Sequence, residues 1–139
     1  MLDAQSEMLA EVSKAVSEFY KVLEEMGLTE NVTTFSTSDF GRTLTSNGNG
    51  TDHAWGGNVF VMGGAVNGNK MYGQYPSLAL GNPLDVESGV LIPTTSTDEY
   101  FAELAIWFGV PKSELKTMFP NIGNFYSTGS SDAPLGFIL

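Results

Sequence analysis

One short window of the sequence holds most of the side chains that could do chemistry. The single histidine, His53, and the single arginine, Arg42, both lie between residues 36 and 64, together with Asp39 and Asp52. Imidazole and carboxylate groups are ligands for divalent metals such as zinc, manganese and calcium. The planar guanidinium group binds phosphate, sulfate or carboxylate through paired hydrogen bonds. This window is therefore where a metal or an anionic small molecule would bind.

Each of these side chains also has a structural explanation. His53 either ligates a metal or makes a hydrogen bond that supports the fold. Asp39 either holds a cation or caps the turn that it begins. Arg42 either pairs with Asp39 or Asp52, or presents its fork of donors to an anion. The sequence has no Gly-x-Ser-x-Gly motif for a nucleophilic serine and no phosphate-binding glycine fingerprint.

Two predicted strands would position this window. Residues 32–37 and 58–66 are rich in β-branched and aromatic residues, and the connection 38–57 is polar and rich in glycine. Asp39 directly follows the first strand, and His53 shortly precedes the second. In an open α/β sheet, ligands bind beside loops at the ends of strands. We therefore expect Asp39 and His53 to meet at one edge of the sheet.

Helices are predicted on both sides of the strands. Residues 2–26 form an amphipathic pattern, in which apolar residues recur at spacings of three and four: Leu9, Val12, Val16, Phe19 and Leu23. Ser96 and Glu99 form a capping-box pattern at the start of a second helix, and residues 111–118 fit a short third one. A helix followed by a buried strand is half of a βαβ unit, so a largely parallel sheet is expected.

Composition limits the classes of function. The chain has 139 residues, enough for a single domain over 1–139. Its sixteen acidic and six basic side chains give a net charge of −10, which excludes sequence-independent binding to nucleic acid and disfavours anionic lipid. A hydrophobic content of 42% with mean hydropathy −0.02 excludes a disordered chain and predicts no membrane span. The absence of cysteine excludes disulfides and thiol catalysis.

Several sequence blocks resemble one bacterial family. The windows Thr37-Ser38-Asp39-Phe40-Gly41-Arg42-Thr43 and Gly50-Thr51-Asp52-His53-Ala54-Trp55-Gly56-Gly57-Asn58 are similar to members of the domain-of-unknown-function family 1501 (DUF1501). Further similar blocks follow in order within residues 32–125, at Val61–Val66, Ile92–Ser96, Trp107–Val110 and Phe119–Phe125. The resemblance covers most of this chain and corresponds to the C-terminal third of a full-length member.

The resemblance implies a fold and a metal site. The family is grouped with the alkaline phosphatase and sulfatase superfamily, which implies a partial α/β sandwich: a few-stranded, largely parallel sheet with an N-terminal helix and C-terminal helices. Asp39 matches the aspartate of the superfamily's metal-binding Asp-His-Gly step, and His53 matches its late histidine ligand. Asp52 would be a further ligand, and Arg42 would orient the anion. Phe40 stands where that step has its second histidine, and a phenyl ring does not ligate metals.

The implied function belongs to a larger protein. The resemblance implies an exported parent, periplasmic or extracellular, that hydrolyses phosphate or sulfate esters with zinc, manganese or calcium. This chain has no signal peptide pattern and is expected to be an inactive C-terminal fragment, because the nucleophile and other ligands come from earlier in such proteins. The alternative is a non-catalytic binding or assembly module. A few-stranded sheet also leaves an edge unpaired, so we expect self-association.

Overall fold

The long N-terminal helix forms as its sequence pattern predicts. The computed structural model describes residues 2–139, and helix α1 covers Leu2–Met26. Gly27 ends it with φ +67°, where its N–H donates to the carbonyl of Glu24 and the N–H of Leu28 donates to that of Leu23. This Schellman arrangement satisfies the last carbonyls of the helix and favours glycine. Among the described residues, no helix is both long and apolar enough to cross a membrane.

The expected largely parallel sheet is wrong. The strands form two separate antiparallel pairs: β1 (Thr34–Phe35) with β4 (Val61–Met62), and β2 (Gly41–Ser46) with β3 (Thr51–Ala54). Parallel neighbours need a crossover connection, usually a helix. Here the connection expected to be a loop turns back as the β2–β3 hairpin, so β4 returns beside β1 in the opposite direction. The fold is a mixture of helices and small antiparallel sheets.

The β2–β3 hairpin follows from its turn. The side-chain carbonyl of Asn47 accepts hydrogen bonds from the backbone N–H groups of Asn49 and Gly50, and Gly48 adopts φ +101°. Asparagine closes such turns with its own side chain, and glycine takes the left-handed conformation without steric cost. The hairpin register then pairs Arg42 with His53 and Gly41 with Ala54.

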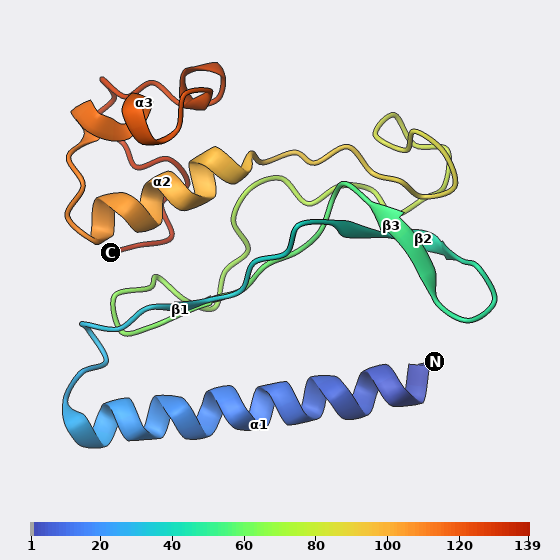
Figure 1. Ribbon diagram of the computed structural model, residues 1–139, viewed down its shortest axis with the longest axis horizontal. Helices are drawn as coiled ribbons and strands as arrows, with labels where there is room; N and C mark the ends of the chain where they lie inside the picture. Colours follow the sequence, from blue (N-terminus) through green and yellow to red (C-terminus); the bar gives the residue numbers. More distant parts are fainter. Residues whose placement is uncertain (1) are drawn as a thin grey trace.

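The C-terminal third contains the two clusters of buried residues. Helix α2 (Thr97–Trp107) starts with the predicted capping box between Ser96 and Glu99. Short helices follow: η1 (Lys112–Glu114), α3 (Leu115–Met118) and η2 (Ile122–Asn124). One cluster consists of Ala102, Leu115, Ile122 and Tyr126, and the other of Tyr100, Leu104 and Phe137. Figure 1 shows these C-terminal helices on one side of the molecule and α1 on the other, with β1 between them.

A buried glutamate holds the end of the chain. Glu103, on α2, is only 2% exposed. Its Oε2 accepts the backbone N–H groups of Leu135 (2.6 Å) and Gly136 (2.7 Å), and its Oε1 accepts that of Ile138 (2.8 Å). The tail then places Phe137 in the second cluster. A buried carboxylate needs such donors, so α2 and the tail form one unit.

Tyr100 connects α2 to the strand region and makes stability sensitive to alkaline pH. Its hydroxyl donates to the carbonyl of Ser36 at 3.0 Å, and burial raises the pKa of its phenol above 10.0. The folded state disfavours the phenolate. This contribution to stability is therefore complete below pH 10 and is lost as the pH rises through the raised pKa. We expect Tyr100→Phe to reduce the loss of urea stability above pH 10, although it lowers stability at pH 7 by about 1 kcal/mol. If the stability of the Tyr100→Phe protein fell above pH 10 as steeply as that of the natural protein, this expectation would be wrong.

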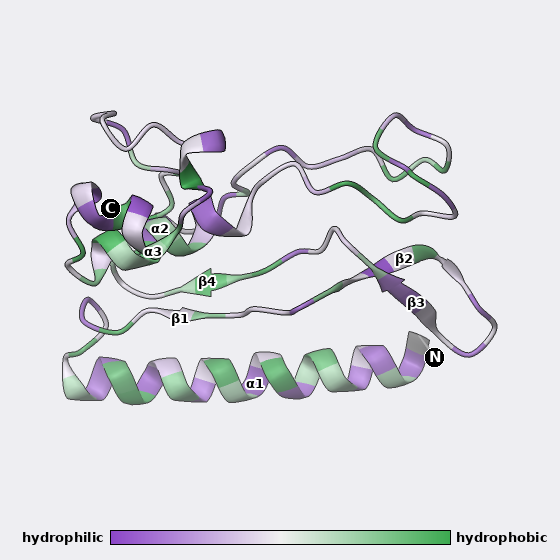
Figure 2. Cartoon of the chain, turned by 45° about the horizontal axis from the view of Figure 1, so that its top comes forward, coloured by the Kyte–Doolittle hydropathy of each residue, from purple (hydrophilic) through white to green (hydrophobic). Residues whose placement is uncertain are grey.

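The folded chain exposes more surface than its mass requires. A compact monomer of 14.9 kDa has an accessible area of about 7,000 Å². This chain has 9,328 Å², a surplus of about 2,300 Å² over that estimate. Many large hydrophobic side chains are exposed, and Figure 2 shows hydrophobic residues recurring along α1.

Candidate functional site

The hairpin brings three of the singled-out residues into one stack. The imidazole of His53 lies against the ring of Phe40, with centroids 3.9 Å apart and planes inclined by 19°. The guanidinium carbon of Arg42 lies 5.2 Å from the same Phe40 centroid. Arg42 also donates through Nη1 to the carbonyl of Thr51 at 2.8 Å. Phe40, Arg42 and His53 therefore form one stack on the exposed side of the hairpin.

Close backbone packing positions this hairpin. Gly41 lies directly against Gly56, so that a Cβ atom at Gly41 would overlap the carbonyl oxygen of Gly56. The N–H of Leu44 donates to the carbonyl of Gly89 at 3.1 Å, and the N–H of Gly56 donates to that of Leu91 at 3.0 Å. The loop around Gly89 and Leu91 is therefore bonded both to β2 and to the segment that follows β3.

The two aspartates differ in their contacts. The turn before β2 is closed by Ser38, whose hydroxyl donates to the carbonyl of Phe40 at 2.9 Å. Asp39 is exposed beside it. Asp52 accepts a hydrogen bond from the side-chain amide of Asn47 at 2.7 Å, which ties it to the hairpin turn. Among residues 2–139, the one ion pair joins Lys21 to Glu18, so Arg42 pairs with neither aspartate.

The described residues do not fit a complete metal centre. Within residues 2–139, no three histidine, aspartate or glutamate side chains lie together in a group that could hold an ion. One face of the His53 ring is covered by Phe40, and Asp52 is engaged by Asn47. Metal binding by Asp39, Asp52 and His53 and anion binding by Arg42 stay predictions.

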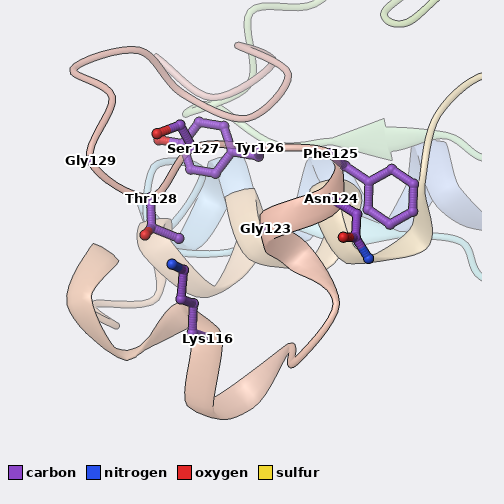
Figure 3. Close-up of a pocket in the computed structure, with 8 residues that line it drawn as sticks. All are labelled: Lys116, Gly123, Asn124, Phe125, Tyr126, Ser127, Thr128 and Gly129. Carbon is purple, nitrogen blue, oxygen red and sulfur yellow. The ribbon is translucent and has the colours of Figure 1, made fainter.

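Two hollows lie away from the hairpin. One, of about 330 Å³, is lined by Lys116 and residues 123–129, and Figure 3 shows the Lys116 side chain reaching towards Thr128. The other, of about 280 Å³, lies between Tyr20 of α1 and residues 61–69. No motif in the sequence marks either hollow, because each is formed by segments that come together only in the folded chain.

The most extensive exposed apolar feature outside the loops is on α1. Six residues of this helix expose their side chains on one stripe: Met8, Val12, Ala15, Phe19, Val22 and Met26. Leu23, by contrast, is buried, and Val16 and Tyr20 are half-buried. Because Leu23 follows Tyr20 by three residues and Val16 by seven, these three lie on a neighbouring face, which packs against the body of the protein.

One comparison with known proteins finds a match. The family described as a protein of unknown function (DUF1501) matches residues 2–114. No curated protein and no solved structure matches the chain.

Proposed function

We propose that the chain, which belongs to the DUF1501 family of proteins of unknown function, is a non-catalytic binding or assembly module. Membership of this family assigns no activity. One observation carries this proposal. The surplus accessible area of about 2,300 Å² lies within the range of area that one partner buries in an obligate interface, about 1,000–2,500 Å².

The chemistry of the exposed surface supports an interface. Large apolar side chains are also well exposed in the connecting segments, including Trp55, Met71 and Phe108, in addition to the α1 stripe. Contiguous apolar surface that remains exposed in a folded chain marks sites of association. The proposal extends to a larger exported protein, periplasmic or extracellular, with an alkaline-phosphatase-like sandwich. The family resemblance supports this extension of the proposal, in which the present chain would be the C-terminal portion of the larger protein.

Self-association is the first expected consequence. Two chains of net charge −10 repel each other, whereas their apolar surfaces attract. Added salt screens the repulsion, so we expect weak association that strengthens with ionic strength. Analytical ultracentrifugation at micromolar concentration should show a mass above 14.9 kDa that rises with protein and salt concentration. A constant monomeric mass at every salt concentration would contradict self-association.

A second candidate is metal-dependent ester hydrolysis by a larger protein. The hairpin supports it in one respect, because its register places Arg42 opposite His53. In such a protein, Asp39, Asp52 and His53 would hold one divalent metal and Arg42 would bind the anionic ester. Ligands from other parts of that protein would have to complete the site.

The isolated chain is expected to be inactive. Aryl phosphates and aryl sulfates with added zinc, manganese or calcium should show no turnover above buffer, because fewer than three ligand side chains meet within residues 2–139. The measurement is release of the phenol, with His53→Ala as the matched variant. Metal-dependent turnover that this variant abolishes would overturn the proposal of a non-catalytic module.

A further inference from the structure

We infer that the exposed stripe of α1 docks a positively charged amphipathic helix from a partner protein. This inference rests on the proposed role as a binding module and names the chemistry of its partner. The stripe consists of Met8, Val12, Ala15, Phe19, Val22 and Met26. Its spacing alternates between four and three residues, the heptad pattern by which one helix packs along another.

The stripe is long enough for helix–helix packing and free of intramolecular cover. It runs over five turns of α1, about 27 Å at 1.5 Å per residue. Each of its five large side chains is at least 45% exposed. The adjoining face is already occupied, because Leu23 is only 5% exposed. The hollow between Tyr20 and residues 61–69 lies on this inner side. A partner would therefore lie on the outer flank of α1.

The charges beside the stripe select the partner. Glu11, Glu18 and Glu25 recur every seven residues, so they form one row along the edge of the stripe that points away from the body. Lys14 and Lys21 lie within one turn of these glutamates, on the side away from the stripe. Glu18 pairs with Lys21 at 2.8 Å, but both side chains of this pair are about 60% exposed and such a pair is weak. A helix with Lys or Arg beside its own apolar stripe would oppose this acidic row with complementary charge.

A second copy of the chain is a poorer occupant. In an antiparallel pair of α1 helices, the row of Glu11, Glu18 and Glu25 would face the same row of the other copy. In a parallel pair, it would face the edge that carries Leu9, Val16 and Leu23, and the body covers Leu23. Neither arrangement neutralises the glutamates. The net charge of −10 adds long-range repulsion between copies.

The test compares two synthetic helices against the full chain. One 21-residue peptide carries Leu and Ile on its heptad stripe with Lys on both edges, and the other differs only in having Glu for Lys. Fluorescence anisotropy at about 50 mM salt should show the Lys peptide binding at least about tenfold more tightly. Its affinity should fall as salt rises, which is opposite to the salt dependence of self-association. A third peptide with the same Lys residues but Ser on the stripe should not bind.

Matched variants assign the effect to the acidic row. The triple variant Glu11→Lys, Glu18→Lys, Glu25→Lys should reverse the preference between the two peptides. The control Glu24→Lys, Glu87→Lys, Glu114→Lys makes the same change of net charge at exposed positions away from this row and should retain it. Circular dichroism of both variants checks that the helix is intact.

The outcomes separate this inference from the proposed function. Equal binding of the Lys and Glu peptides would overturn the inference of a basic partner, and so would an equal loss of the preference for the Lys peptide in both triple variants. Either result would leave the proposal of a binding module in place. Binding of the Lys–Ser peptide would show attraction by charge alone and would also overturn it. Failure of every peptide together with a monomeric mass at all salt concentrations would overturn both proposals.

Discussion

Replacing Glu103 by alanine is expected to lower the free energy of unfolding by about 4 kcal/mol. The substitution leaves the N–H groups of Leu135, Gly136 and Ile138 without their acceptor and opens a cavity on α2. Hydrogen bonds to a buried charge are the strong ones, and an unsatisfied donor costs about 1–3 kcal/mol. The expected loss of stability is smaller than three such costs added together, because water can hydrate the N–H groups of the released tail.

Urea unfolding followed by tryptophan fluorescence measures this effect. Glu103→Gln retains one acceptor oxygen and should fall between alanine and the natural residue. Glu114→Ala is the matched control, because that glutamate is exposed and should change the free energy by less than about 0.5 kcal/mol. Equal stability of the Glu103→Ala and Glu114→Ala proteins would show that the tail does not depend on this carboxylate.

Replacing Gly41 by alanine is expected to open the base of the β2–β3 hairpin at a cost of about 3 kcal/mol. The added Cβ would overlap the carbonyl oxygen of Gly56, and a backbone neighbour cannot rotate away as a side chain can. Since Gly41 is paired with Ala54, moving it shifts Phe40 away from His53. The stack should be lost before the C-terminal clusters unfold.

The single histidine makes this change directly measurable. In the folded chain, the Phe40 ring 3.9 Å from the imidazole should move the His53 proton resonances upfield, and Gly41→Ala should return them towards the values of a free imidazole. Gly50→Ala is the control in the same hairpin, because a Cβ there would contact nothing within 4 Å. Unchanged His53 resonances in the Gly41→Ala protein would show that the stack does not need close packing at this glycine.

The stack gives Phe40 a structural role. The proposed superfamily relationship would place a second histidine ligand at this position. In this structure, Phe40 instead covers one face of His53 and lies beneath Arg42. The position therefore contributes contacts between rings and a cation, which agrees with the proposal of a non-catalytic module.

Elements stabilised by neighbouring residues were predictable from the sequence. The bounds of α1 follow from its apolar spacing and Gly27, and the start of α2 follows from Ser96 and Glu99. In both cases the deciding hydrogen bonds join residues within five positions of each other. Such interactions depend little on the rest of the fold. The sequence alone also determined the acidic charge and the family resemblance.

Only the tertiary structure decided the direction of the strands and the partners of the buried groups. Antiparallel pairing of β1 with β4 depends on where the chain turns back, and alternating side chains occur in parallel and antiparallel strands alike. Glu103 reads as one more surface glutamate, because its three donors lie 32 to 35 residues further along the chain. The stripe on α1 became a candidate surface only when the fold left it uncovered, since an apolar helix face has the same pattern whether it is buried or exposed.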